Sequence, residues 1–118
     1  MKYNKKEHKD WSKKIREVFD NRCAICGIKS GDINKNGKKI ILDSHHLVPK
    51  VEHRYDVGVG ILLCKNHHKF NKTCSAHGSG LLFFEIIKVK YEKLYQYCLN
   101  ILKSEFETEN DIIVKKDI

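Results

Sequence analysis

The sequence has little that would let it enter or cross a membrane. Its apolar runs, such as Leu81 to Phe84, are far too short to span a bilayer. Residues 1–10 are mostly charged and lack the apolar core of a signal peptide. There is one proline, no internal repeat and no low-complexity run among the 118 residues. We therefore expect a single-domain cytoplasmic protein with no membrane partner.

Acidic residues are in the minority. The 15 Asp and Glu are outnumbered by 23 Lys and Arg, which leaves a net charge of +8. Such an excess suits a polyanionic partner, of which DNA or RNA is the obvious example. A soluble surface that is merely rich in lysine would give the same balance, so charge alone does not separate the two interpretations.

The cysteine count is odd, so the five cysteines cannot all pair in internal disulfides. A chain this short buries a modest core, which a structural metal would supplement. Cys23 and Cys26 are separated by two residues, as are Cys64 and His67. These four ligands predict a closed, tetrahedral zinc site. The alternatives are buried free cysteines or a redox pair at Cys23 and Cys26, but a redox pair leaves Cys64 and His67 unexplained.

Histidines are concentrated near this predicted site, at positions 45, 46, 67, 68 and 77. If residues 65–71 are helical, His67 and His68 diverge by about 100° around the axis. His67 then takes the zinc and leaves His68 for another cavity. Neutral imidazoles bind divalent metals, and an imidazole also takes a proton from water near neutral pH.

His45 and His46 follow a short predicted strand at residues 39–42. Neighbours in a regular strand point to opposite faces, so both histidines reach one site only if the strand bends or ends there. Pro49 favours such an end. In the alternative interpretation, one histidine of the pair is structural.

Helices are expected on both sides of this region. An N-terminal helix capped by Asp10 or Ser12 would bury the stripe Trp11, Ile15, Val18 and Phe19, after a flexible segment at residues 1–9. Residues 29–39 are rich in turn formers and predict a loop or hairpin tip. Residues 50–60 predict a second loop and residues 61–63 a second short strand. One longer C-terminal helix would bury the stripe Phe84, Ile87, Tyr91, Leu94, Cys98 and Ile101. A charged, loosely ordered tail is expected over residues 105–118.

Three segments in order resemble the HNH endonuclease family in its zinc-stapled form, especially small phage and bacterial members. They are Cys23-x-x-Cys26-Gly27, the run from Leu42 to Pro49 with His45 and His46, and the run from Gly60 to His68. The resemblance implies an α+β fold with a small ββα-metal, treble-clef-like core that holds a structural zinc and is flanked by N-terminal and C-terminal helices. Residues 10–104 would form this nuclease domain, in a bacterial cytoplasm and encoded by the bacterium or by a phage.

The resemblance also implies roles for individual residues. His46 would be the general base of a DNA endonuclease, and His45 and His68 would hold a divalent cation, Mg²⁺, Mn²⁺, Ni²⁺ or Zn²⁺. His77 is a further candidate ligand for that cation. The DNA backbone would be held by Lys50, Arg54, Lys65, Lys69 and Lys72.

Val59 departs from the family pattern. An asparagine usually occupies this position and pins the loop that bears the general base, so its absence is expected to weaken the orientation of His46. Two other hypotheses therefore stay open: a zinc-dependent nucleic-acid-binding module that is catalytically weak or inactive, and a protein-interaction domain that uses the helix at residues 83–102. Monomer and homodimer are equally compatible with the sequence.

Overall fold

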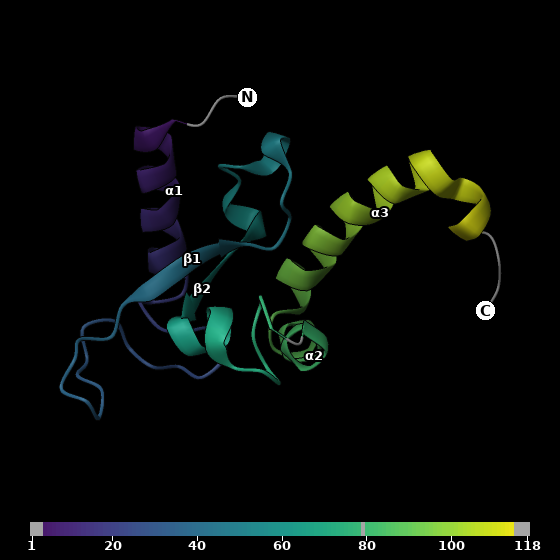
Figure 1. Ribbon diagram of the computed structural model, residues 1–118. Helices are drawn as coiled ribbons and strands as arrows, with labels where there is room; N and C mark the ends of the chain where they lie inside the picture. The colour runs from purple at the N-terminus through teal and green to yellow at the C-terminus, as the bar shows by residue number, and fades with distance from the viewer. Residues whose placement is uncertain (1–3, 79, 115–118) are drawn as a thin grey trace.

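The computed structural model describes residues 4–78 and 80–114, with side chains described as far as residue 104. Three α-helices surround a two-stranded antiparallel sheet in the described residues (Figure 1). The elements in chain order are α1 (Lys5–Val18), β1 (Leu42–His46), the 3₁₀ turns η1 (Val51–His53) and η2 (Val57–Val59), β2 (Gly60–Cys64), the π-helical turn η3 (Asn66–Phe70), α2 (Gly80–Lys90) and α3 (Glu92–Val114). The predicted α+β class is confirmed.

Helix α1 begins earlier than its sequence pattern indicated. Asn4 caps it, because the Asn4 side chain accepts a hydrogen bond from the Glu7 N–H at 3.0 Å. The predicted cap at Asp10 or Ser12 is therefore wrong. Residues 5–9, expected to belong to a flexible segment, form the first turns of the helix, whereas residues 1–3 lie outside the described residues.

The inner face of α1 packs on the strands through Trp11 and Ile15, as predicted. Both side chains are buried, and a Cβ atom at Gly60 would collide with them. Glycine at the start of β2 thus allows the helix to approach the sheet closely. Val18, predicted in the same stripe, is 64% exposed because it lies in the last turn and borders an open apolar pocket.

The two strands carry His45, His46 and Cys64 of the predicted site. Leu42 pairs with Cys64 at one end of the sheet and His46 pairs with Gly60 at the other. β2 is buried along its whole length, which agrees with its apolar sequence. β1 begins where the predicted strand was expected to end, so that His45 and His46 lie inside the strand and not after it.

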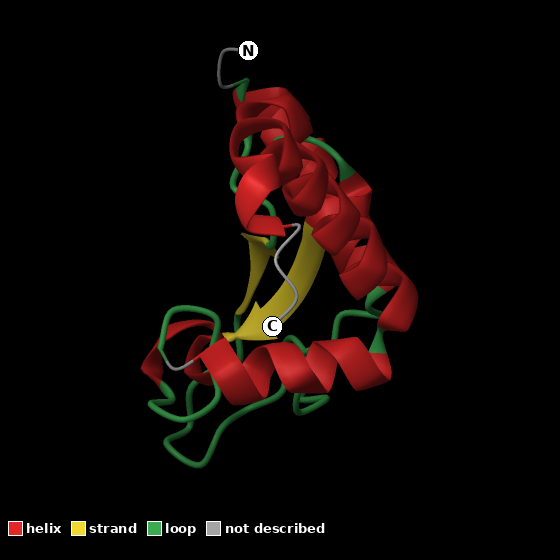
Figure 2. Ribbon diagram, turned by 90° about the vertical axis from the view of Figure 1, so that its right-hand side faces the viewer, coloured by secondary structure: helices red, strands yellow, loops and turns green. Residues whose placement is uncertain are grey.

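The predicted C-terminal helix is two helices that meet at Tyr91, and they run in different directions (Figure 2). The Tyr91 hydroxyl donates to the Ala24 carbonyl at 2.8 Å, which fixes the junction against the core. The break changes which face of α2 is buried. Phe83 and Ile87 are fully buried, whereas Phe84, predicted in the stripe, is 42% exposed.

The C-terminal part of the predicted stripe is confirmed, whereas the predicted tail starts too early. Cys98 is buried, and Leu94 and Ile101 pack against the core as predicted. α3 continues to Val114, beyond the expected start of a loosely ordered tail at residue 105, and residues 115–118 lie outside the described part. Among the described residues, no helix combines the length and apolar character needed to cross a membrane.

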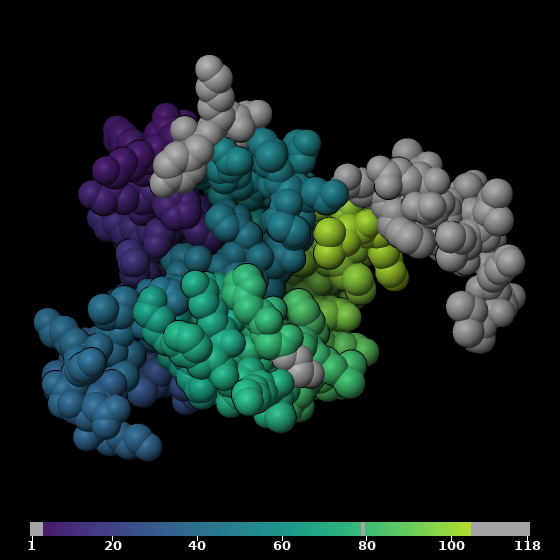
Figure 3. Space-filling model, in the orientation of Figure 1, coloured from purple at the N-terminus to yellow at the C-terminus, as the bar shows by residue number. Residues whose placement is uncertain are grey.

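The turn-rich segment projects from the body of the protein (Figure 3). An isolated bridge between Ile33 and Lys39 closes it into a hairpin, and Gly37 has a positive φ of 77° at its tip. The predicted hairpin tip at residues 29–39 is confirmed. This hairpin links the turn after α1 to the start of β1. Because it projects outward, it does not separate the strands from the core.

Candidate functional site

A tight turn after α1 presents the first two cysteines. Gly27 donates its N–H to the Cys23 carbonyl at 2.9 Å and has the positive φ, 76°, that its position after Cys26 predicted. The Ala24 N–H bonds to the Leu62 carbonyl at 2.8 Å, so the turn is attached directly to β2. Cys64 lies at the end of that strand and completes a group of three thiols.

The three sulfur atoms fit one ion. The Sγ atoms of Cys23, Cys26 and Cys64 all lie within 4.8 Å of one another, and those of Cys26 and Cys64 are 3.8 Å apart. Two thiolates bound tetrahedrally to zinc at about 2.3 Å would be separated by roughly 3.8 Å. The observed separation matches that value and is far longer than a disulfide bond, about 2.05 Å.

The electrostatics of the group also fit a metal. A hydrogen bond from the Cys64 thiol, aided by backbone N–H groups, lowers the pKa of Cys23 to about 4. Burial raises the pKa of Cys26, and the bond to Cys23 raises that of Cys64. One thiolate therefore forms readily, and a bound cation would supply the positive charge that the other two need to ionise.

His67, the predicted fourth ligand, lies outside this group of three. Its Nδ1 is 3.1 Å from the Cys74 carbonyl oxygen, which can only accept, so Nδ1 carries the proton. Nε2 is then the nitrogen with a lone pair for a metal, an arrangement common among metal-binding histidines. The role of His67 in zinc binding stays a prediction.

A second group consists of three imidazoles from three different segments. His45 lies on β1, His68 on η3, and His77 in the loop before α2, and their ring nitrogens all lie within 4.8 Å of one another. Nε2 of His68 is 3.2 Å from His45 Nδ1 and 3.1 Å from His77 Nε2. Nitrogens bound to one ion at about 2.1 Å would be roughly 3.0 to 3.4 Å apart, so this group also fits a divalent cation.

A hydrogen bond and a lowered pKa leave two of these imidazoles in the form that binds a metal. Asp43 accepts a hydrogen bond from His68 Nδ1 at 3.0 Å, which leaves the lone pair of His68 on Nε2, facing the other two rings. Burial, followed by the electrostatic repulsion that His68, His77 and His46 exert when protonated, lowers the pKa of His45 to about 4 and keeps its ring neutral at physiological pH. Neutral imidazole is the form that binds a metal.

Asp43 was not assigned a role from the sequence. Partial burial opposes its ionisation, but hydrogen bonds from Lys65 and His68 outweigh that effect and lower its pKa. Lys65 Nζ lies 3.0 Å from the second carboxylate oxygen. Asp43 precedes His45 by two residues, and residues at that spacing share one face of a strand, so periodicity was a signal that could have identified it.

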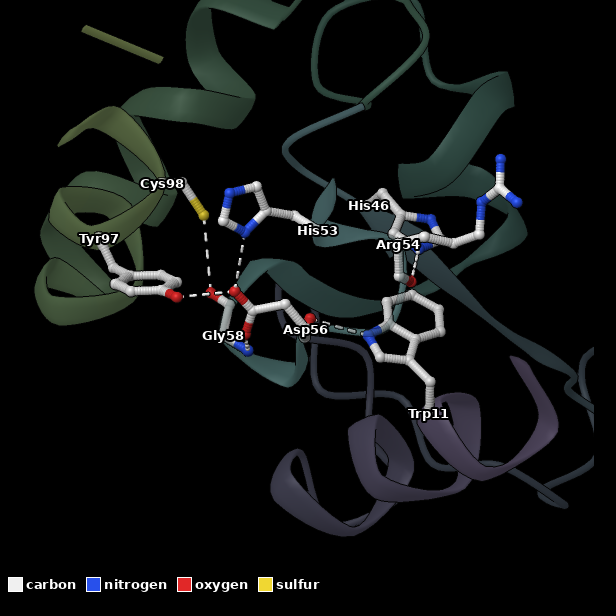
Figure 4. Close-up of polar contacts among 8 residues, drawn as sticks. All are labelled: Trp11, His46, His53, Arg54, Asp56, Gly58, Tyr97 and Cys98. Atoms are coloured by element: carbon white, nitrogen blue, oxygen red, sulfur yellow. Dashed lines mark hydrogen bonds and ion pairs between the residues drawn. The ribbon is translucent and has the colours of Figure 1, made fainter. Parts of the chain in front are cut away.

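His46 points away from the three imidazoles, as neighbours in a strand do. Its ring stacks on Trp11 with a centroid separation of 4.0 Å and an interplanar angle of 2°. Its Nε2 lies 2.7 Å from the Arg54 carbonyl oxygen (Figure 4). Because a carbonyl only accepts, Nε2 carries the proton and the lone pair lies on Nδ1.

The predicted DNA-contacting cations lie in two places. Lys50 and Arg54 line a pocket of about 180 Å³ together with His46, Val48, Pro49 and Val51. Lys65, Lys69 and Lys72 are exposed on and around η3, near His68 in the sequence. The first set therefore lies beside His46, and Lys65 of the second set is joined to His68 through Asp43.

Comparison with protein-family models, curated proteins and solved structures found no match for this chain.

Proposed function

We propose that this protein is a metal-dependent endonuclease that hydrolyses phosphodiester bonds in DNA on a ββα-metal fold. The order of elements supports the fold: two antiparallel strands with a loop between them are followed at once by the short helical turn η3. The strands contribute His45 and His46, and the turn contributes His68. This is the distribution that the resemblance to HNH endonucleases implies.

Two metals have different tasks in this proposal. Cys23, Cys26, Cys64 and His67 hold a structural zinc that joins the turn after α1 to the start of η3. His45 and His68, with His77, hold a divalent cation. When bound, this cation supplies positive charge to the scissile phosphate and to the leaving oxygen. The three protein nitrogens leave room on the cation for substrate oxygens.

The observation that carries the proposal is the protonation pattern of His46. Its Nε2–H is held by the Arg54 carbonyl at 2.7 Å, so Nδ1 has the lone pair that takes a proton from water. The stacked Trp11 indole fixes the plane of the ring. An imidazole held by one nitrogen and basic at the other is suited to general-base catalysis.

The substrate is polyanionic, in keeping with the net charge of +8. Lys50 and Arg54 border the pocket beside His46, and we assign them to the phosphates on either side of the bond that is cut. We assign Lys65, Lys69 and Lys72, which are exposed on and around η3, to further phosphate contacts. Phosphate contacts of this kind position the DNA without reading its sequence.

Cleavage of supercoiled plasmid in Mg²⁺, Mn²⁺, Ni²⁺ and Zn²⁺ tests the proposal. We expect the wild-type protein to nick or linearise the plasmid, and His46→Ala to abolish this with zinc content and thermal stability retained. Asp32→Asn, in the projecting hairpin, is the control, because the hairpin is assigned no part in metal binding or catalysis. Wild-type rates in His46→Ala would disprove the assigned role.

The same assay distinguishes the alternative function. A nucleic-acid-binding module would bind DNA with an affinity that falls steeply with salt, but would leave the plasmid intact with every metal. That result would replace the nuclease proposal with a binding function for the same basic surface.

A further inference from the structure

The loop between the strands holds His46 but needs an anchor of its own. The carbonyl that accepts the His46 Nε2–H belongs to Arg54, which directly follows η1. η1 and η2 are single turns of three residues each, too short to be stable on their own. The position of the Arg54 carbonyl therefore depends on side-chain contacts elsewhere in the loop.

Asp56 makes several such contacts (Figure 4). Its Oδ1 accepts the Gly58 N–H at 2.9 Å and caps η2. Its Oδ2 accepts the Tyr97 hydroxyl at 2.7 Å and lies 3.1 Å from His53 Nδ1. The carboxylate thus joins both turns of the loop to Tyr97 of α3, which lies 41 residues further along the chain.

The backbone of Asp56 also holds Trp11, which packs against the face of the His46 ring. Its carbonyl oxygen accepts the Trp11 Nε1–H at 2.9 Å, and the Trp11 indole lies flat against the His46 ring. The edge of the imidazole is therefore held by Arg54, two residues before Asp56, and its face by the indole that Asp56 binds. Both contacts depend on where Asp56 lies.

We propose that Asp56 is a positioning residue that fixes the orientation and tautomer of His46 and is itself held by Tyr97 of α3. This inference rests on the proposed nuclease function for its catalytic consequence. Val59, expected to leave the loop poorly held, is fully buried and packs with Val48 and Cys98. The polar bonds that hold the loop therefore come from a side chain three positions earlier.

The consequence for chemistry is geometric. If Asp56 no longer binds Gly58, Tyr97 and His53, the Arg54 carbonyl moves and His46 loses the acceptor that keeps its proton on Nε2. Misplacement of a catalytic group by about 1 Å costs on the order of a hundredfold in rate. Binding of DNA should hardly change, because Asp56 is acidic and is not among the proposed phosphate contacts.

The experiment compares Asp56→Ala, Asp56→Asn and Tyr97→Phe, with Tyr95→Phe as a control that removes a hydroxyl elsewhere on α3. Nitrogen-15 NMR of the histidine rings identifies the His46 tautomer directly. Plasmid cleavage at saturating metal gives the rate constant, and a binding assay gives the affinity for DNA. Zinc content and the urea midpoint show that each variant is folded.

We expect wild-type His46 to be the Nε2–H tautomer. Asp56→Ala should give mixed tautomers and a cleavage rate lower by tenfold to a hundredfold, as an order of magnitude, with affinity for DNA within about twofold of wild type. Tyr97→Phe should lower the cleavage rate several-fold. Asp56→Asn should recover part of the rate, because its amide oxygen still accepts the Gly58 N–H. If Asp56→Ala unfolds, Tyr97→Phe carries the test.

The outcomes separate the two proposals. An unchanged His46 tautomer and unchanged cleavage in Asp56→Ala, or in Tyr97→Phe if the first variant unfolds, would overturn the positioning role and leave the nuclease proposal standing. A wild-type protein that cuts nothing while its variants shift the His46 tautomer would overturn the nuclease proposal and keep the structural role of Asp56. Equal losses of affinity and rate would identify Asp56 as part of DNA binding and overturn the inference.

Discussion

Two adjacent histidines on β1 have different surroundings and so different chemistry. His45 lies among imidazoles on one face of the strand, whereas His46 lies between Trp11 and the Arg54 carbonyl on the other. Neither residue could do the work of its neighbour, because a strand alternates its side chains between faces. A substitution at His45 is therefore expected to affect metal binding, and one at His46 to affect proton transfer.

Asp43 is expected to set the affinity of the imidazole group for a cation. Asp43→Asn removes the charge that holds His68 Nδ1–H, and loss of such a contact typically weakens metal binding by about tenfold to a hundredfold. Calorimetric titration with Mn²⁺ or Ni²⁺ measures this, with Asp32→Asn in the projecting hairpin as the control. Equal affinities for the two variants would contradict the role of Asp43.

Cys98 is expected to make the fold sensitive to alkali. Burial, aided by the nearby Asp56 charge, raises the pKa of its thiol from 9.0 to about 11. Between these values the unfolded chain has lost the proton and the folded protein keeps it, so stability falls as pH rises from 9 to 11. Urea unfolding across this range should show a shallower decline for Cys98→Ala, and parallel declines would refute the assignment.

At the scale of elements, the position of β2, the turn at Cys23 and the hairpin were predictable from local pattern, whereas β1 lies at Leu42–His46 and not at the predicted residues 39–42. Gly27 is a local signal that was interpreted correctly. The predicted end of the strand before His45 is wrong, because His45 and His46 both lie inside β1 and alternate between its faces. The start of α1 was missed because its first turns are charged and its cap, Asn4, is followed by no apolar residue until Trp11. The break at Tyr91 was missed because the apolar spacing runs through it, and a tertiary bond to Ala24 determines the junction.

Gly60 should be the point where α1 and β2 are most sensitive to added volume. Gly60→Ala places a methyl group against Ile15 and Trp11 and is expected to cost about 1–3 kcal/mol of unfolding free energy. Ile15→Val shortens the opposing side chain, so the double variant should recover part of that loss. Additive costs in a double-mutant cycle measured by urea unfolding would mean that the two residues are not in contact.

The zinc predicted at the three thiols should stabilise the fold by holding the turn after α1 against the start of η3. Its removal with a strong chelator is expected to lower stability by about 4 kcal/mol if the ion is present at a thousandfold excess over its dissociation constant. Cys23, Cys26 and Cys64 should then react quickly with a thiol reagent, while buried Cys98 reacts slowly. Rapid reaction of all three before chelation would show that no metal protects them.

At the scale of the whole molecule, the excess of positive charge determines how DNA would bind. Each phosphate contact contributes about −0.9 to the slope of log affinity against log salt. Lys69→Ala should therefore reduce the magnitude of the slope by roughly one, and Lys103→Ala, on α3, should leave it unchanged. Equal slopes for wild type and both variants, measured by fluorescence anisotropy, would place the DNA elsewhere.

The sequence anticipated which residues approach each other better than it anticipated how they are held. His45 and His68 come together as expected, but Asp43, Trp11 and Asp56 were assigned no part in the site. The contacts of Trp11 and Asp56 join segments far apart in the chain, and no local pattern encodes such pairs. Asp43 is different, because it shares a strand face with His45 and periodicity could have identified it. Residue type and spacing identify candidate metal ligands, whereas tertiary packing determines which of these side chains lie close together.

The single turn η3 links the two candidate metal centres through consecutive residues, His67 and His68. Any insertion or deletion between Cys64 and His68 would rotate both imidazoles at once and take each of them away from its own partners. Neither centre can change its spacing while the other keeps its geometry. The projecting hairpin is better suited to added residues or to the attachment of a reporter dye, because it contributes to neither group.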